Sequence, residues 1–303
     1  MRHDTVEGSI PALLALLLAA AATADAGASR PLAPAATLTR AATGHYVSPV
    51  TVNGGGPFDF VVDTGAESCA VYQEFADARG LADAGEESLQ GQTGTTTIRL
   101  ARVDSIVTAG VSAGPLSCAV LPPRRDGARL NGIVGLDSMK HLAVLFSPAQ
   151  AALAFYRSGV APEDCLGAGY VAIRARHLDS TLLAFPVTIN GVTGTAVLDS
   201  GARRSVINRK FALAAGVDLQ SLQPDTPLYG ATGVEQEMRH GRVGTLELGD
   251  RAWSDFSGTV ADLAVFAAFG VADEPAMILG LDFLASDAML VDFPAMMVYI
   301  ARP

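Results

Sequence analysis

The chain has 303 residues, of which 50% are hydrophobic, and a formal net charge of −10 at pH 7. This acidic balance, without a long run of charge, excludes nucleic acid as an expected partner. The length suits two lobes of about 120 residues each, and the apolar content favours a compact soluble enzyme.

The N-terminus has the pattern of a secretory signal peptide. Residues 10–22 are mostly apolar, and Ala-Thr-Ala at 22–24 or Ala-Asp-Ala at 24–26 offers a cleavage site. Asp4 and Glu7 outweigh Arg2 before this run, which is unusual for a signal peptide. The run is shorter than the roughly 18 apolar residues of a membrane span, so a retained anchor is the alternative. We expect residues 1–26 to be removed and the mature protein to be exported, either periplasmic or secreted.

Residues 27–43 form an N-terminal segment before the first predicted strand. Residues 30–42 are rich in Ala, Pro and Thr. This composition predicts a loose lead-in, with a short propeptide as the alternative.

The first half contains a strand that ends in an acidic turn. The apolar residues 58–62 are followed by Asp63-Thr64-Gly65-Ala66, and a second β-rich segment begins at Cys69. The pattern therefore places Asp63 at the tip of a buried strand. Glycine at the third position permits a close approach of another backbone, and the Thr64 hydroxyl can form a hydrogen bond to the other half.

Further along the first half, three motifs follow in order. They are a Gly-rich hairpin tip, Gly91-Gln92-Thr93-Gly94; an apolar segment, Ile133-Val134-Gly135; and a hairpin that turns at residues 146–149. The second half repeats the whole series. Its members are Asp199-Ser200-Gly201-Ala202 after the apolar residues 196–198, Gly230-Ala231-Thr232-Gly233, Ile278-Leu279-Gly280, and a turn at residues 292–295. This period is too long for a solenoid, so duplicated lobes around one site explain the repeat better.

These paired motifs resemble those of the retropepsin-like aspartic peptidases, in a tandem single-chain form similar to bacterial exported members. The resemblance covers roughly residues 38–303. It implies an all-β fold of two homologous β-barrel lobes, residues 44–157 and 170–303, joined by a linker at 158–169. The active site is then expected in the cleft between the lobes. Because one chain supplies both lobes, we expect a monomer.

The resemblance also implies the roles of the site residues. Asp63 and Asp199 are expected to share one proton and activate a water, as is known for aspartic proteases, without a metal or cofactor. The remaining active-loop residues support them: Thr64, Gly65, Ala66, Ser200, Gly201 and Ala202. The flap glycines over a peptide substrate are Gly91, Gly94, Gly230 and Gly233. The alternative is a pseudoprotease of the same fold that binds peptides without cleaving them.

The chain has three cysteines, Cys69, Cys118 and Cys165. In an oxidising compartment this number favours one disulfide and one free thiol. In the fold that the resemblance implies, the strand containing Cys118 runs near Cys69, so these two are the expected pair. Cys165 lies in the segment between the lobes and is expected to be free.

Polar residues near the two acidic turns have competing interpretations. Arg203 and Arg204 follow the second turn, where they either favour acidic substrates or, for Arg203, pair with Glu67 of the first lobe. Asp137 and Asp282 follow the apolar-apolar-Gly motifs and are predicted to be helix N-caps. Gly110-Val111-Ser112-Ala113-Gly114 fits a nucleophile-elbow pattern but falls between predicted strands, so a serine nucleophile is disfavoured. No histidine spacing suggests a zinc site.

Overall fold

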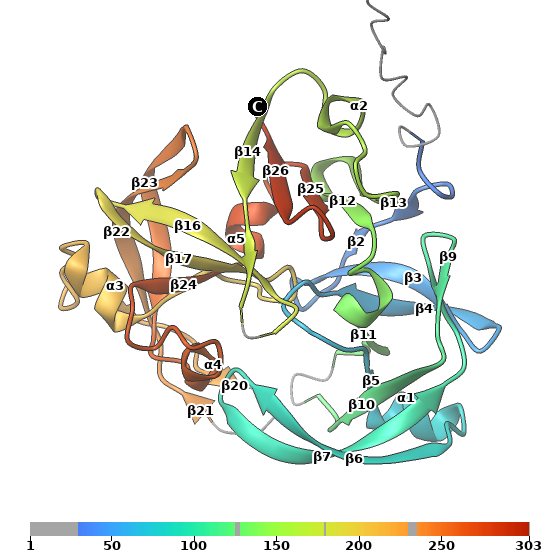
Figure 1. Ribbon diagram of the computed structural model, residues 1–303. Coiled ribbons are helices and arrows are strands. Elements are labelled where there is room, and N and C mark those ends of the chain that lie inside the picture. The colour runs from blue at the N-terminus through green and yellow to red at the C-terminus, as the bar shows by residue number, and fades with distance from the viewer. Residues whose placement is uncertain (1–29, 125–127, 179, 230–234, 303) are drawn as a thin grey trace, which may run out of the picture.

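The computed structural model of the protein describes residues 30–124, 128–178, 180–229 and 235–302. The predicted signal peptide lies outside these residues. The described chain is mostly β and forms two lobes with a sheet shared between them (Figure 1). In the described ranges, no helix has the length and apolar character needed to cross a bilayer.

The first lobe is built on a sheet of ten strands, in which β2 pairs with β3 and the order of the others is β6-β7-β10-β5-β11-β4-β3-β8-β9. Alternating residues of these strands, such as Val50 and Val52, point into a core that Phe60 and Phe75 fill. The strands are β2 (Thr39–Arg40), β3 (Tyr46–Val52), β4 (Gly55–Val62), β5 (Ala70–Tyr72), β6 (Asp83–Gly91), β7 (Gly94–Val103), β8 (Ile106–Thr108), β9 (Val111–Ala113), β10 (Leu116–Leu121) and β11 (Gly132–Val134), with helix α1 (Gln73–Ala78) between β5 and β6.

The second lobe repeats this plan on a sheet of eight strands, in the order β15-β16-β17-β24-β18-β23-β22-β19. Its strands are β15 (Arg176–His177), β16 (Leu183–Ile189), β17 (Val192–Leu198), β18 (Val206–Ile207), β19 (Gln223–Pro224), β22 (Arg239–Leu248), β23 (Arg251–Val260) and β24 (Ala276–Leu279), and β20 (Leu228–Tyr229) pairs separately with β21 (Glu235–Gln236). The helices are α3 (Arg209–Ala214), α4 (Ala264–Ala268) and α5 (Leu281–Leu284).

A six-stranded sheet belongs to both lobes. Its order is β1-β13-β12-β25-β26-β14, so the terminal hairpin of each half lies beside that of the other (Figure 1). These elements are β1 (Ala36–Thr37), β12 (Ala143–Ser147), β13 (Ala152–Tyr156), β14 (Tyr170–Arg174), β25 (Met289–Asp292) and β26 (Met297–Ala301), with the short helices η1 (Leu136–Ser138), η2 (Pro148–Gln150) and α2 (Pro162–Leu166) nearby in the chain. Backbone hydrogen bonds between β12 and β25 therefore fasten the lobes together.

The prediction of a loose lead-in at residues 30–42 is wrong for its central part. β1 pairs with β13, and β2 pairs with β3 of the first lobe. Leu38 between them is 3% exposed, and its backbone N–H donates to the Ala151 carbonyl at 2.9 Å. Burial of this side chain and strand pairing hold the segment on the protein, in spite of its Ala- and Pro-rich composition.

The cysteines lie as the sequence analysis expected. A disulfide joins Cys69, just before β5, to Cys118 in β10, and both residues are fully buried. Cys165 lies in α2 as a free, half-buried thiol. The bridge ties the segment after Asp63 to the neighbouring parallel strand.

Candidate active site

Each aspartate stands at the end of a buried strand. β4 runs parallel to β11, and the Asp63 N–H donates to the Val134 carbonyl at 3.0 Å. In the second lobe β17 runs parallel to β24, and the Asp199 N–H donates to the Leu279 carbonyl at 3.1 Å. The apolar-apolar-Gly segments thus lie directly behind the two acidic turns and fix where each strand ends.

Four hydrogen bonds cross between the two acidic turns. The Thr64 N–H donates to Ser200 Oγ and the Ser200 N–H donates to Thr64 Oγ1, both at 3.0 Å. Ser200 Oγ in turn donates to the Val62 carbonyl at 2.8 Å, and Thr64 Oγ1 donates to the Leu198 carbonyl at 3.2 Å. Because both hydroxyls are buried and fully used, they hold the two turns face to face.

The glycines of the turns let the carboxyl groups meet. A Cβ on Gly65 would lie 2.5 Å from the carboxyl carbon of Asp199, and a Cβ on Gly201 would collide with the carboxyl group of Asp63. Backbone donors satisfy one oxygen of each aspartate. The Gly65 N–H donates to Asp63 Oδ1 at 2.8 Å, and the N–H groups of Gly201 and Ala202 donate to Asp199 Oδ1 at 2.9 and 2.8 Å.

The two carboxyl groups titrate as a pair. Burial, and then the charge of Asp199, raise the pKa of Asp63 well above its ordinary value, and a hydrogen bond with Asp199 acts in the same direction. Burial also raises the pKa of Asp199, against the lowering effect of the Ala202 N–H and of the hydrogen bond with Asp63. The pair therefore holds one proton between its two carboxyl groups up to a higher pH than two separate aspartates would.

The predicted hairpin tip of the first lobe lies over this pair. β6 and β7 form a long hairpin in which Gly91 pairs with Gly94, so that Gln92 and Thr93 make the turn. Gly94 has φ 138°, a conformation that favours glycine. The corresponding glycines of the second lobe, Gly230 and Gly233, lie outside the described residues.

The prediction that Asp137 and Asp282 are helix N-caps is wrong. Gly135 and Gly280 hold the cap positions, and the two carboxylates instead accept from the segments after the acidic turns. Asp137 Oδ2 accepts from the Cys69 N–H at 2.8 Å. Asp282 Oδ1 accepts from the N–H and the hydroxyl of Ser205 at 2.8 and 2.7 Å. Each carboxylate therefore stabilises the segment that follows one of the acidic turns.

Of the two interpretations of Arg203, the ion pair with Glu67 is absent from the described part of the chain. Glu67 Oε1 accepts from the N–H and hydroxyl of Thr181, at the start of the second lobe. Arg203 donates to the carbonyl of Thr43, at the start of the first lobe. Each side chain contacts the opposite lobe, but through backbone and hydroxyl groups rather than through the other's charge.

The amino-acid sequence matches the aspartyl protease family over two segments, residues 48–138 and 185–283. Each segment contains one acidic turn, its flap region and its apolar-apolar-Gly motif. This chain belongs to the aspartyl protease family. No curated protein has significant sequence similarity to it.

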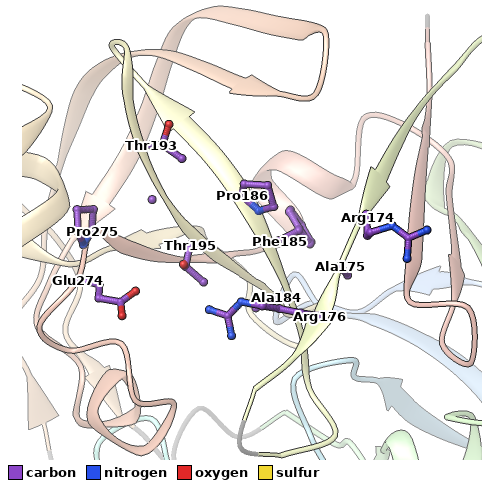
Figure 2. Close-up of a pocket in the computed structure, with 11 residues that line it drawn as sticks. Arg174, Ala175, Arg176, Ala184, Phe185, Pro186, Thr193, Thr195, Glu274 and Pro275 are labelled. Atoms are coloured by element: carbon purple, nitrogen blue, oxygen red, sulfur yellow. The ribbon is translucent and has the colours of Figure 1, made fainter.

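A surface groove of this aspartyl protease family member lies away from the two aspartates. This groove of about 540 Å³ lies on the second lobe, and Figure 2 shows Arg176 on one side of it and Glu274 with Pro275 on the other. Its lining includes neither Asp63 nor Asp199. Among the described residues, no cluster of His, Cys, Asp and Glu has the arrangement of a metal site.

The contact of one residue with the aspartates is not predicted by the sequence. The sequence analysis places Gln92 only in the Gly-rich hairpin tip, yet its side-chain amide donates to Asp199 Oδ2 at 3.4 Å. The sequence places a glutamine between two flap glycines but carries no signal for a contact that spans the two lobes.

Proposed function

We propose that the protein is an aspartic endopeptidase in which Asp63 and Asp199 together activate a water molecule. The observation that carries the proposal is the meeting of the two carboxyl groups at facing strand ends, held by the crossed bonds of Thr64 and Ser200. Two ionisable groups buried side by side are costly to a fold, and such pairs occur where chemistry uses them.

In this proposal Asp199 is the charged member of the pair, because it accepts hydrogen bonds from N–H groups of Gly201, Ala202 and Gln92. Charged Asp199 takes a proton from the water as the water oxygen adds to the carbonyl carbon of the peptide bond, while Asp63 gives its proton to the carbonyl oxygen. The tetrahedral intermediate then loses the amine. Asp199 donates its proton to the leaving nitrogen, the C–N bond breaks, and Asp63 recovers a proton from the intermediate hydroxyl. No covalent intermediate with the enzyme is formed.

We propose a peptide in extended conformation as the substrate. The hairpin β6–β7 offers strand backbone above the aspartates, and an added strand gains main-chain hydrogen bonds along such an edge. Side-chain pockets on alternate residues would then set the cleavage preference. A monomer suffices, because both aspartates come from one chain.

We further propose that activity is highest in mildly acidic solution. The pair is active with one proton, so activity falls as the pH rises through the upper apparent pKa of the pair and falls as the pH drops through the lower one. Burial raises the pKa of both carboxyl groups. Ala66 and Ala202 have no hydroxyl with which to stabilise the charged forms. An optimum at about pH 3 or lower, below the ordinary value of an aspartate, would contradict this proposal.

We also propose that the protein is exported. The disulfide between Cys69 and Cys118 supports an oxidising compartment such as the periplasm or the cell exterior. Detection of the chain in the cytoplasm with both thiols reduced would argue against export.

The test is cleavage of a mixed peptide library at several pH values by the parent and by the Asp63→Asn and Asp199→Asn variants. Both variants should lose about 10²- to 10⁴-fold in rate, the range expected for loss of general acid–base catalysis. Asp59→Asn is the matched control, because Asp59 is an exposed residue of the same strand that leads to Asp63. If the folded parent binds peptides but cleaves none of them, the protein is the pseudoprotease alternative.

A further inference from the structure

The tip of the hairpin β6–β7 makes two contacts with the second lobe. The Gln92 side-chain Nε2 donates to Asp199 Oδ2 at 3.4 Å, and the Gln92 carbonyl accepts from the Val265 N–H at 3.3 Å. Thr93, the next residue, is buried. In Figure 1 the hairpin tip lies beside α4, the helix that contains Val265. The first lobe thus reaches across to the second with both the backbone and the side chain of one residue.

The oxygen that Gln92 contacts is the one left for chemistry. Oδ1 of Asp199 already accepts two backbone N–H groups, from Gly201 and Ala202. Within the described ranges Oδ2 has no backbone donor, and it accepts instead from the side-chain amide of Gln92 at the hairpin tip. This is the oxygen with which charged Asp199 would accept a proton from water. An amide donor at this position competes with that water for the same lone pairs.

The second contact is the hydrogen bond from the Val265 N–H to the Gln92 carbonyl. Val265 is the second residue of α4, and the first N–H groups of a helix have no partner within the helix. The Gln92 carbonyl supplies that partner. At 3.3 and 3.4 Å both bonds are longer than typical protein hydrogen bonds, so a ligand with several main-chain groups can replace them.

We infer that Gln92 is an autoinhibitory latch, which a substrate must displace from Asp199 before water is activated. This inference rests on the proposed function. It also names the substrate class more closely. Displacement requires a peptide long enough to pair with the strands β6 and β7 and to draw the tip away from Asp199, so short peptides are disfavoured relative to long ones.

The test compares Gln92→Ala with Gln220→Ala. Gln220 is an exposed glutamine of the second lobe between α3 and β19, outside the hairpin and the acidic turns. One measurement is hydrogen exchange at the Val265 amide in the ligand-free protein. The other is the association rate of peptides of four and of ten residues that contain a non-hydrolysable statine unit.

In Gln92→Ala the Val265 amide should exchange roughly three- to tenfold faster than in the parent, and the short statine peptide should associate faster by a similar factor, the size expected for the net loss of one typical hydrogen bond. The longer peptide should gain less, and Gln220→Ala should match the parent. Unchanged Val265 exchange in Gln92→Ala would overturn the latch, whether or not the protein cleaves peptides. Unchanged association together with a lower kcat would also overturn it and make Gln92 a catalytic residue instead. Failure of every statine peptide to bind would count against the proposed function, while the exchange measurement would still decide the latch.

Discussion

After the first aspartate the chain reaches Cys69, and after the second it reaches Ser205, at equivalent positions of the two lobes. The Cys69 carbonyl accepts from the Ala119 N–H, as the Ser205 carbonyl accepts from the Thr259 N–H. Cys69 is then fixed by a disulfide to Cys118. Ser205 instead donates to Asp282 and accepts from the Gly280 N–H at 3.0 Å.

The comparison teaches that the two loops need the same conformation but not the same stabilising interaction. A covalent bond holds the first loop and a set of hydrogen bonds holds the second. The first lobe therefore depends on an oxidising environment for full stability, and the second lobe does not.

The largest expected effect is loss of the disulfide. The Cys69→Ala, Cys118→Ala double variant should lose roughly 2–4 kcal/mol of unfolding free energy, because the bridge closes a loop with a sequence separation of 49 residues. Chemical denaturation at neutral pH measures this change, and Cys165→Ala is the control, since that thiol is free. A stability equal to that of the parent would mean that the first loop is held by its hydrogen bond to Asp137 alone.

A smaller loss is expected for Ser205→Ala in the second lobe. Removal of the hydroxyl leaves the buried Gly280 N–H without its acceptor, which costs about 1–3 kcal/mol. Denaturation and the rate of peptide cleavage should both report the change, because Ser205 lies in the loop that follows Asp199. Ser254→Ala, at an exposed position of β23, should behave as the parent. If Ser205→Ala is as stable as Ser254→Ala, hydrogen bonding does not replace the disulfide in this lobe.

The smallest effect concerns an ion pair that follows the second acidic turn. Arg204 pairs with Asp225, whose side chain is 9% exposed, whereas Ser68 occupies the equivalent position of the first lobe. Burial alone would raise the pKa of Asp225, but the bonds from Arg204 and from the Thr226 N–H hold it below its ordinary value. The stabilisation is therefore present above the unfolded pKa and is lost as pH falls through the folded one.

Asp225→Asn should accordingly cost about 1 kcal/mol or less near pH 7, since Arg204 is half exposed. The difference from the parent should shrink as the pH falls below about 4, the ordinary aspartate value. Denaturation curves at both pH values test this, with Asp218→Asn, an exposed position of the same lobe, as control. A difference that grows in acid would reverse the sign and exclude a depressed pKa for Asp225.

The duplicated motifs predicted two repeated lobes because each motif is local and appears twice, and the family resemblance that they carry supplied the fold. Asp63 and Asp199 could be predicted as site residues because each lies in one copy of the repeated motif. The family resemblance implied that the two carboxyl groups face each other. The N-terminal segment was misjudged because its two-residue strands show no periodicity and β1 pairs with β13, far along the chain.

Contacts between distant segments explain the other errors. The Gly-Leu-Asp pattern suggested a local N-cap, but Asp137 and Asp282 bond to residues that are 68 and 77 positions away. The charges of Glu67 and Arg203 suggested a pair, and only the spatial arrangement shows that Thr181 and Thr43 are closer partners. The role of Gln92 likewise depends on where the flap tip lies in space.

In the shared sheet, Val144 pairs with Val291 and Leu145 pairs with Leu290. The turns at residues 146–149 and 292–295 align Val144 with Leu290 and Leu145 with Val291, so each pair becomes the other when the lobes are exchanged. This is the contact pattern of a two-fold symmetric dimer. Two separate polypeptides, cut between β13 and β14, would therefore retain matching edges and are expected to reassemble. The covalent connection then serves mainly to raise the effective concentration of one half at the other.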